Sequence, residues 1–278
     1  MRFQFGPCLV LCASVTACTA NSHDSTVSAG TGGSGGAGAI ACSSNGFAWP
    51  KGASAAISLT YDDALTSQLK YAVPVLDAKS LKATFFLSEF WWEFNTYKPQ
   101  WGALAASEHE LASHTVKHPC QKELPGYTLD QMGAELDQNV ATLRSLGATG
   151  RLTFAYPCGA TELGTPSTSY IPAVTSRFLA ARGTNWAVAN PSNVDLGLVP
   201  SMLPPTSATG NDLTDLVKQA ESNQGWLVLG FHGISDQGEY LNIPQASHDA
   251  LCDYLAMNAA RLWVAPFGTV ADYVSRCR

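Results

Sequence analysis

The residues of this chain best suited to chemistry are two adjacent aspartates and three histidines, each following an apolar run. Asp62 and Asp63 end the segment ISLTYDD, and His114 and His118 stand four residues apart in SHTVKH. His232 ends the segment LVLGFH. Each has an ordinary explanation on its own, such as turn formation for the aspartates or a hydrogen-bonded core position for His232. Their shared placement after separate apolar runs favours one common site.

The spacing of these residues suits a metal ion. Two histidines four residues apart lie on one side of a helical turn, so His114 and His118 can bind one cation. One aspartate would complete a set of two imidazoles and one carboxylate that leaves positions open for water and substrate. The other, unligated, can accept a proton from that water. The pattern therefore predicts a hydrolytic site whose cation offsets the repulsion between the two aspartates.

The elements that must position these residues are strands alternating with helices. Strand-like runs occur at 54–60, 83–88, 110–114, 151–156, 178–183, 226–231 and 262–266. Several are apolar on consecutive residues, as expected for strands buried on both faces of a parallel sheet. Helical patterns follow the first run and occupy 128–146, 212–222 and 247–260, with a capping box formed by Thr128 and Gln131.

This alternation predicts an α/β fold with a parallel sheet, either open or closed into a barrel. Ligands of such folds collect at the carboxyl ends of the strands, which is where the two aspartates and the three histidines fall. Residues 42–278 fit one large domain better than two small ones.

The N-terminal part of the chain is expected to serve export and tethering. Residues 1–20 combine Arg2, an apolar stretch and small residues, as a signal segment does. Val15-Thr16-Ala17-Cys18 resembles a lipobox, which would place a lipid on Cys18, although simple cleavage after Ala17 or Ala20 is the alternative. Residues 21–41 are rich in glycine and serine and predict a flexible linker. We therefore expect an exported protein, either a cell-envelope lipoprotein or a secreted one.

Composition narrows the range of partners. The chain is 46% hydrophobic, carries a net charge of −6 and has no cluster of Lys and Arg. Nucleic acid is therefore not expected as a partner. Membrane contact is expected only through a lipid at Cys18, and the protein is expected to be a monomer.

Four segments, in this order, resemble the motifs of the polysaccharide deacetylase family, also called carbohydrate esterase family four or the NodB-homology domain. They are TYDDA, HTVKH, AYPCG and LGFHGI, and the resemblance spans about residues 48–275. It implies a distorted (β/α)7 barrel in a single domain. It also implies removal of acetyl groups from an acetylated polysaccharide or oligosaccharide, with N-acetyl groups of a glycan containing N-acetylglucosamine as the first hypothesis. An acetylxylan esterase and a noncatalytic sugar-binding lipoprotein are the alternatives.

The resemblance also implies roles for individual residues. Asp62 would be the general base, His232 the general acid, and Asp63, His114 and His118 the ligands of a divalent metal, usually Zn²⁺. The backbone N–H of Cys158 would stabilise the oxyanion. Further residues assigned to substrate contact are Tyr156, which lies in AYPCG, and Leu229 and Phe231, which would line a pocket for the acetyl methyl group.

The third motif departs from the family pattern, because the arginine that orients the general base falls at Ala155. Arg182, at the end of the fifth strand-like run, is the candidate replacement, and an ordinary salt bridge is the alternative explanation for it. The aspartate that orients the acid histidine is also not evident, and Asp195 is the candidate.

Cysteines and tryptophans complete the predicted rim. Cys120 and Cys158 each follow a motif at the same strand ends, which predicts a disulfide between them. Cys252 and Cys277 would form a second, with Cys42 competing for Cys277. Trp91 and Trp92 follow the second run and could stack on sugar rings, although packing against neighbouring loops is the more ordinary explanation.

Overall fold

The computed structural model describes residues 40–278 apart from 45, 236 and 237. The predicted export segment, Cys18 and nearly all of the predicted linker lie outside the described residues. Residues 40–278 form one unit around a parallel sheet. No helix among the described residues has the length and apolar character needed to cross a membrane.

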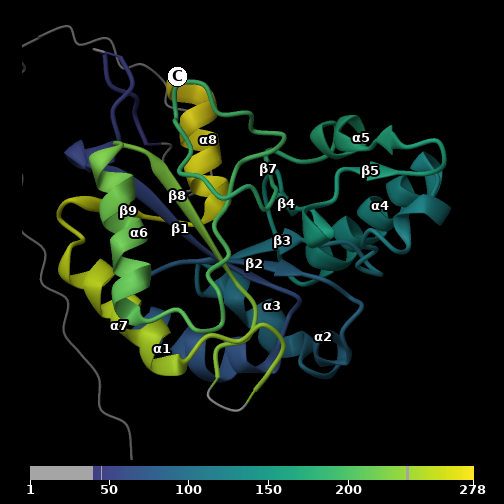
Figure 1. Cartoon of the computed structure of the whole chain (residues 1–278), viewed down its shortest axis with the longest axis horizontal. Helices are drawn as coiled ribbons and strands as arrows, with labels where there is room; N and C mark the ends of the chain where they lie inside the picture. Colours follow the sequence, from purple (N-terminus) through teal and green to yellow (C-terminus); the bar gives the residue numbers. More distant parts are fainter. Residues whose placement is uncertain (1–39, 45, 236–237) are drawn as a thin grey trace, which may run out of the picture. The chain divides into compact units, whose positions relative to one another are not determined.

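Each of the seven predicted runs overlaps one strand of this sheet (Figure 1). The strands are β1 (Ala55–Asp62), β2 (Thr84–Leu87), β3 (Glu110–Ser113), β4 (Phe154–Ala155), β7 (Ala181–Arg182), β8 (Trp226–Phe231) and β9 (Leu262–Val264). All pair in parallel, in the order β7-β4-β3-β2-β1-β8. A separate antiparallel hairpin joins β5 (Glu162–Leu163) to β6 (Thr168–Ser169).

The gap between the edge strands β7 and β8 is bridged by a segment that the sequence did not reveal. Val199 forms a parallel bridge with Arg182 of β7, and Met202 forms one with Leu229 of β8. Residues 199–202 therefore complete a distorted barrel and confirm the expected (β/α)7 fold. β9 takes no part in closing the ring, because it pairs with residues 55–57 of β1, on the same side of that strand as β2.

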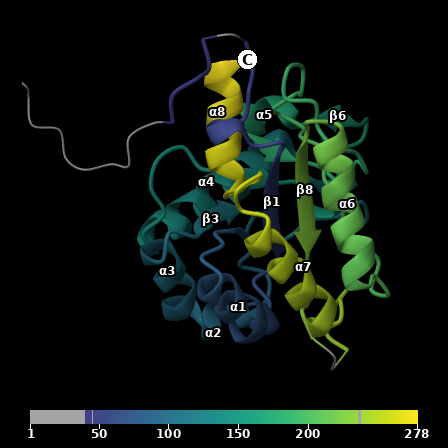
Figure 2. The same ribbon diagram turned by 90° about the vertical axis from the view of Figure 1, so that its left-hand side faces the viewer.

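Helices cover the sheet as the sequence predicted. The α-helices are α1 (Val73–Ala78), α2 (Trp92–Thr96), α3 (Lys98–Ala106), α4 (Leu129–Ser145), α5 (Ile171–Thr175), α6 (Gly210–Ser222), α7 (Gln245–Met257) and α8 (Phe267–Cys277). Shorter turns are η1 (Pro50–Gly52), η2 (Gln68–Ala72), η3 (Leu124–Gly126) and η4 (Pro157–Gly159). The capping box of Thr128 and Gln131 is present at the start of α4. Figure 2 shows α6 and α7 side by side next to β8.

Side chains of the sheet divide into an inner and an outer apolar cluster. Ile57 and Leu59 of β1 belong to the outer cluster, which packs under the surrounding helices, whereas Ala56 belongs to the inner one with Val270 of α8. Because successive side chains of a strand point to opposite faces, Asp62 shares the inner face with Ala56. The alternation of β1 therefore directs the first aspartate into the barrel.

One predicted disulfide is wrong. The structure joins Cys42 to Cys277, with 5.3 Å between their Cα atoms, and leaves Cys252 as a buried free thiol. Cys252 belongs to the outer cluster under α7, whereas Cys277 packs against the inner cluster at the end of α8. The sheet therefore separates Cys252 from Cys277. Disulfides are typical of exported proteins.

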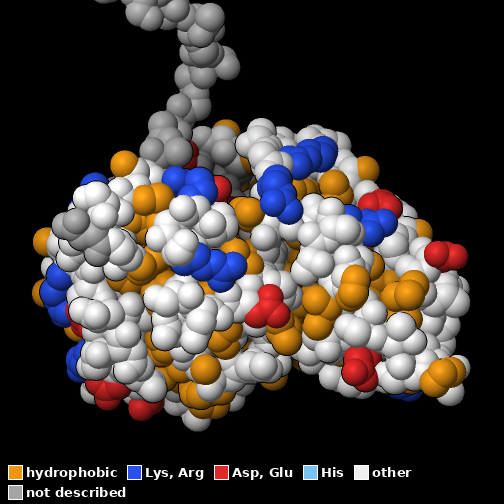
Figure 3. Space-filling view, turned by 90° about the horizontal axis from the view of Figure 1, so that it is seen from above, with side chains coloured by type: hydrophobic (Ala, Val, Ile, Leu, Met, Phe, Trp, Pro, Cys, Tyr) orange, Lys and Arg blue, Asp and Glu red, His pale blue; other side chains and the backbone are white. Residues whose placement is uncertain are grey.

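Charged side chains do not gather into a basic surface on the face shown in Figure 3, where Lys and Arg lie in separate groups with acidic side chains between them. The observation agrees with the net charge of −6.

Candidate active site

The backbone turns sharply where β1 ends, and this turn brings both aspartates to the same rim. Asp62 is the last residue of β1, and Asp63 and Ala64 both have left-handed backbones, with φ of 77° and 63°. Residues other than glycine rarely adopt this conformation. A continued strand would direct Asp63 to the face opposite Asp62. The left-handed backbone instead places both side chains at the same rim.

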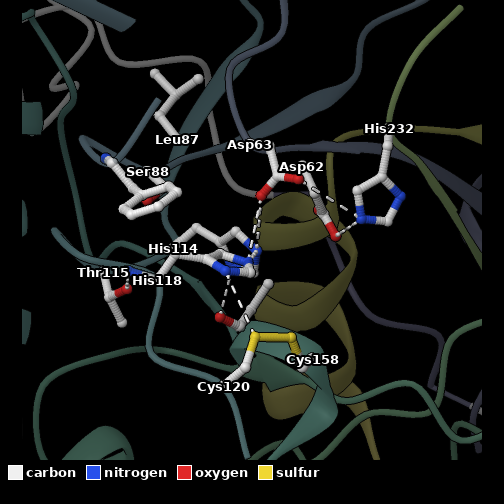
Figure 4. Close-up of polar contacts among 12 residues, drawn as sticks. Asp62, Asp63, Leu87, Ser88, His114, Thr115, His118, Cys120, Cys158 and His232 are labelled. Carbon is white, nitrogen blue, oxygen red and sulfur yellow. Dashed lines mark hydrogen bonds and ion pairs between the residues drawn. A yellow bond between two sulfur atoms is a disulfide. The ribbon is translucent and has the colours of Figure 1, made fainter. Parts of the chain in front are cut away.

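The two histidines of HTVKH face Asp63 across this rim (Figure 4). The Nε2 atoms of His114 and His118 lie 3.6 and 3.3 Å from Oδ1 of Asp63, and 3.2 Å from each other. The convergence agrees with the prediction, but the local structure does not. The segment is an irregular loop with positive φ at Thr115 and His118, and not a helical turn.

The loop is held by a residue that the sequence did not single out. Glu135 of α4 is buried, and its Oε2 accepts hydrogen bonds from the backbone N–H groups of Val116 and Lys117 at 3.0 and 2.8 Å. A carboxylate that receives two backbone donors fixes the loop between the histidines. Only the glutamate's position on the buried side of α4 could have indicated this role.

The donor set fits a divalent cation. Asp63 is fully buried, and neither of its carboxylate oxygens has a hydrogen-bond partner among the described residues. Nδ1 of His114 lies 2.8 Å from the carbonyl oxygen of Ala155, so Nδ1–H donates there and leaves the Nε2 lone pair for a metal. One ligand atom from each of Asp63, His114 and His118 lies within 4.8 Å of the other two.

Burial shifts the pKa values of Asp63, His114 and His118 towards their uncharged forms. Burial raises the pKa of Asp63 to about 6, although the neighbouring His232 works in the opposite direction. Burial lowers the pKa of His114 to about 3 and also lowers the pKa of His118. The imidazoles are therefore neutral at physiological pH, which is the protonation state that binds metals.

Asp62 lies in a different electrostatic environment. Its carboxylate is paired with the guanidinium of Arg182, which is itself 1% exposed and stacks on the ring of Phe86 at 4.9 Å. Burial alone would raise the pKa of Asp62, but Arg182, together with His114 and His232, lowers it to about 2. Two adjacent carboxylates thus have opposite pKa shifts, and Asp62 remains ionised.

His232 completes the group from the end of β8. Its Nε2 lies 4.0 Å from Oδ2 of Asp62 and 3.8 Å from Oδ2 of Asp63. The ring of Tyr240 stands edge-on to the imidazole, with 5.5 Å between centroids. Asp195 accepts a hydrogen bond from the N–H of Gly197 and has no contact with His232 among the described residues.

The disulfide between Cys120 and Cys158 joins two loops of the rim, as predicted. Sγ of Cys120 lies 3.6 Å from Nδ1 of His118, so the bridge contacts a candidate ligand directly. Cys158 has a left-handed backbone with φ of 54° in η4, and its carbonyl accepts a hydrogen bond from the side chain of Gln121.

Two of the predicted substrate contacts are wrong. Tyr156 is 1% exposed and donates its hydroxyl hydrogen to the carbonyl of Gly197, and Leu229 is fully buried in the outer cluster. Alternation along their strands turns both side chains towards the helices. Phe231 is also buried, but it borders a cavity of about 200 Å³ that His232 and Leu241 line as well.

Aromatic side chains surround one side of the site. The ring of Trp91 lies 6.5 Å from that of His118 and 5.7 Å from that of Tyr240, whereas Trp92 is exposed and lies beside Tyr97. Phe90, also exposed, packs edge-on against Trp91. Only Trp91 of the predicted pair therefore borders the histidines. Tyr240 was missed because nothing in its local sequence marks it.

Comparison with known proteins agrees with the fold and the motifs. Residues 50–168 match the sequence model of the polysaccharide deacetylase family. A curated gellan lyase of Bacillus sp. is 28% identical over 200 residues, and the chain spans only 8% of that much longer protein.

Solved structures share the fold at low sequence identity. A "probable polysaccharide deacetylase" from Pseudomonas aeruginosa PAO1 superposes with a TM-score of 0.62 at 13% identity, over 82% of this chain and 93% of the other. The catalytic domain of a peptidoglycan N-acetylglucosamine deacetylase from Eubacterium rectale gives 0.52 at 16% identity, over 77% and 89%.

The resemblance that the motifs indicated is therefore confirmed over residues 50–168, which match the polysaccharide deacetylase family. The matched residues include both aspartates, His114 and His118, whereas His232 lies beyond them.

Proposed function

We propose that this protein is a metal-dependent hydrolase that removes acetyl groups from an acetylated carbohydrate, with N-acetyl groups of a glycan containing N-acetylglucosamine as its substrate. The observation that carries the proposal is the convergence of Asp63, His114 and His118 beside an ionised Asp62. Among the described residues, neither carboxylate oxygen of Asp63 has a hydrogen-bond partner. A ligand set and a separate base are the two parts that hydrolysis by a divalent metal requires.

The residues divide the reaction between them. Asp63, His114 and His118 would hold a divalent cation, Zn²⁺ in this proposal, which would supply Lewis acidity to the acetyl carbonyl and lower the pKa of the attacking water. Asp62 accepts the proton of that water, and Arg182 holds its carboxylate in place. The N–H of Cys158 is assigned the role of stabilising the developing oxyanion. His232, on the other side of the aspartates, donates a proton to the departing amine or alcohol.

The surroundings of the site suit a sugar polymer better than a small ester. Exposed Phe90 and half-buried Trp91 offer apolar faces next to His118, and sugar rings stack on such faces. A cavity of about 370 Å³, lined by Gln121, Gly159 and Glu162 among others, lies beyond the Cys158 loop. It would accommodate a sugar unit next to the acetylated one.

An acetate-release assay tests the proposal. The full chain is incubated with N-acetylglucosamine oligomers and, in parallel, with acetylated xylan, each with and without a chelator and with Zn²⁺ added back. We expect chelator-sensitive acetate release from the oligomers, restored by Zn²⁺. Acetate release from acetylated xylan alone would show that the protein cleaves acetyl esters and not N-acetyl groups. A metal content near zero, with no acetate from either polymer, would instead indicate the noncatalytic sugar-binding protein.

We also propose that the protein is exported and held at the cell envelope by a lipid on Cys18, which precedes the Gly/Ser-rich segment 21–41, and that it acts as a monomer. The two disulfides support export. Metabolic labelling with a fatty acid tests the anchor: Cys18→Ser should abolish the label and release the protein into the medium. A labelled Cys18→Ser variant would contradict the anchor.

A further inference from the structure

Two buried residues after β1, Ser67 and Gln68, fasten the loop that carries the aspartates to the loop that carries His232. Ser67 is 5% exposed and Gln68 is fully buried. Neither belongs to a motif noted in the sequence, and neither lies among the candidate metal ligands. What they contact assigns them a role in the reaction.

The amide of Gln68 joins the two candidate proton-transfer residues through their backbones. Its Nε2 donates to the carbonyl oxygen of Asp62 at 2.5 Å and to the carbonyl oxygen of His232 at 3.0 Å. Both partners are acceptors only, so the amide can adopt just one orientation, because the reverse would direct Oε1 at two other oxygens. The contacts therefore fix the side chain as a bridge across residues 62 and 232.

Ser67 contacts the loop after β8 at two further residues, Ile234 and Glu239. Its Oγ accepts a hydrogen bond from the N–H of Ile234 at 3.0 Å and also contacts the carboxylate of Glu239. Glu239 precedes Tyr240, whose ring packs edge-on against the imidazole of His232. Two consecutive residues therefore hold the loop after β8 at His232, at Ile234 and at Glu239.

We propose that Gln68, supported by Ser67, is a positioning residue that sets the reach of His232 as the proton donor. The inference rests on the proposed function. Nε2 of His232 lies 4.0 Å from Oδ2 of Asp62 and 3.8 Å from Oδ2 of Asp63, so in the proposed reaction it can reach a leaving group bound beside the aspartates. A misplacement of about 1 Å there can cost about a hundredfold in rate. Loss of the two hydrogen bonds should therefore slow the step in which the leaving group is protonated.

Gln68→Met tests this role because it keeps the length of the side chain and removes both donors. Each variant is assayed on N-acetylglucosamine oligomers, whose amine must be protonated as it leaves, and on 4-nitrophenyl acetate, whose phenolate leaves without a proton. We expect kcat on the oligomers to fall at least about tenfold, with a clearly smaller loss on the aryl ester, which still needs Asp62 but not His232, and with metal content unchanged. Gln219→Met, at an exposed position on α6, is the matched control.

A second comparison separates positioning from general damage. If Gln68 acts through His232, Gln68→Met should add little to the loss already caused by His232→Ala, because the two changes remove the same step. Equal losses on both substrates, or no loss on either, would overturn the proposal, as would full additivity with His232→Ala. Wild-type protein that releases no acetate would instead refute the proposed function.

Discussion

Ala155 and Arg182 are register partners on the neighbouring parallel strands β4 and β7. The family resemblance expects the arginine that orients the general base at position 155, and this chain supplies a guanidinium from the paired position of the next strand. Partners in register share one face of a sheet, so Arg182 enters the same barrel interior and reaches Asp62. The ion pair is buried, which makes it unlike the surface salt bridge that was the alternative explanation.

Replacing Arg182 by Ala should lower turnover at least about tenfold while metal content stays near one equivalent, because Asp62 loses its partner and the ligands remain. Acetate release and elemental analysis measure the two quantities. Arg177→Ala, which breaks an exposed ion pair with Asp137, is the control and should change neither. Unchanged turnover in Arg182→Ala would show that the ion pair has no role in the reaction.

The register predicts a rescue. In the double variant Ala155→Arg/Arg182→Ala the guanidinium returns from the partnered position on the same face, and part of the lost turnover should return with it. A rate for the double variant no higher than that of Arg182→Ala would mean that position 155 cannot deliver the guanidinium to Asp62. Circular dichroism of both variants checks that the sheet remains intact.

The two aspartates should respond differently to removal of their charge. Asp63→Asn should lose both metal and activity, because it removes the anionic ligand. Asp62→Asn should retain the metal and lose activity, because it removes only the proton acceptor. Isothermal titration with Zn²⁺, alongside the acetate assay, distinguishes the two outcomes. Retained metal in Asp63→Asn together with lost metal in Asp62→Asn would reverse the assignment.

Metal binding should weaken at acidic pH. A carboxyl group whose pKa is raised takes up a proton at higher pH than an exposed one does, and burial raises the pKa of Asp63 to about 6. Protons therefore compete with the cation as pH falls through about 6, and affinity should be highest above that value. Zinc titrations between about pH 5 and 8 measure the effect. Affinity that does not change over this range would show that Asp63 is not the titrating ligand.

Removing the bridge between Cys120 and Cys158 should affect both stability and the metal. The bridge links two cysteines with a sequence separation of 38. Without it the unfolded chain gains conformational entropy, so replacing both cysteines by serine should lower the free energy of unfolding by about 2–4 kcal/mol. Zinc affinity should also fall, since Cys120 packs against His118. Denaturant unfolding and zinc titration measure the two losses. A double-serine variant with wild-type zinc affinity would show that the bridge does not position His118.

Much of the fold was predictable because the strands are apolar on both faces and the motif residues directly follow them. The aspartates and histidines could be placed at one rim from that rule alone. Where the outcome depends on contacts between distant segments, the sequence carries no local signal. Bridging by residues 199–202, the pairing of Cys42 with Cys277 and the support of the histidine loop by Glu135 all belong to this class.

The face of the sheet to which a side chain points was also predicted wrongly at two positions. Tyr156 and Leu229 lie within the AYPCG and LGFHGI segments, and the family resemblance led to their assignment as substrate contacts. Alternation along a strand sends neighbouring side chains to opposite faces, and both residues lie in the outer cluster. Asp63 would also point to the outer face if the strand continued, but its left-handed backbone turns it into the site. No sequence pattern predicts this conformation.

The most direct test of the account is anomalous diffraction from crystals of the full chain grown with Zn²⁺. We predict one strong peak, with Nε2 of His114, Nε2 of His118 and a carboxylate oxygen of Asp63 each about 2.0–2.2 Å from the metal and with Asp62 unligated. A zinc ion bound elsewhere, or one that both aspartates ligate while either histidine stays free, would contradict it.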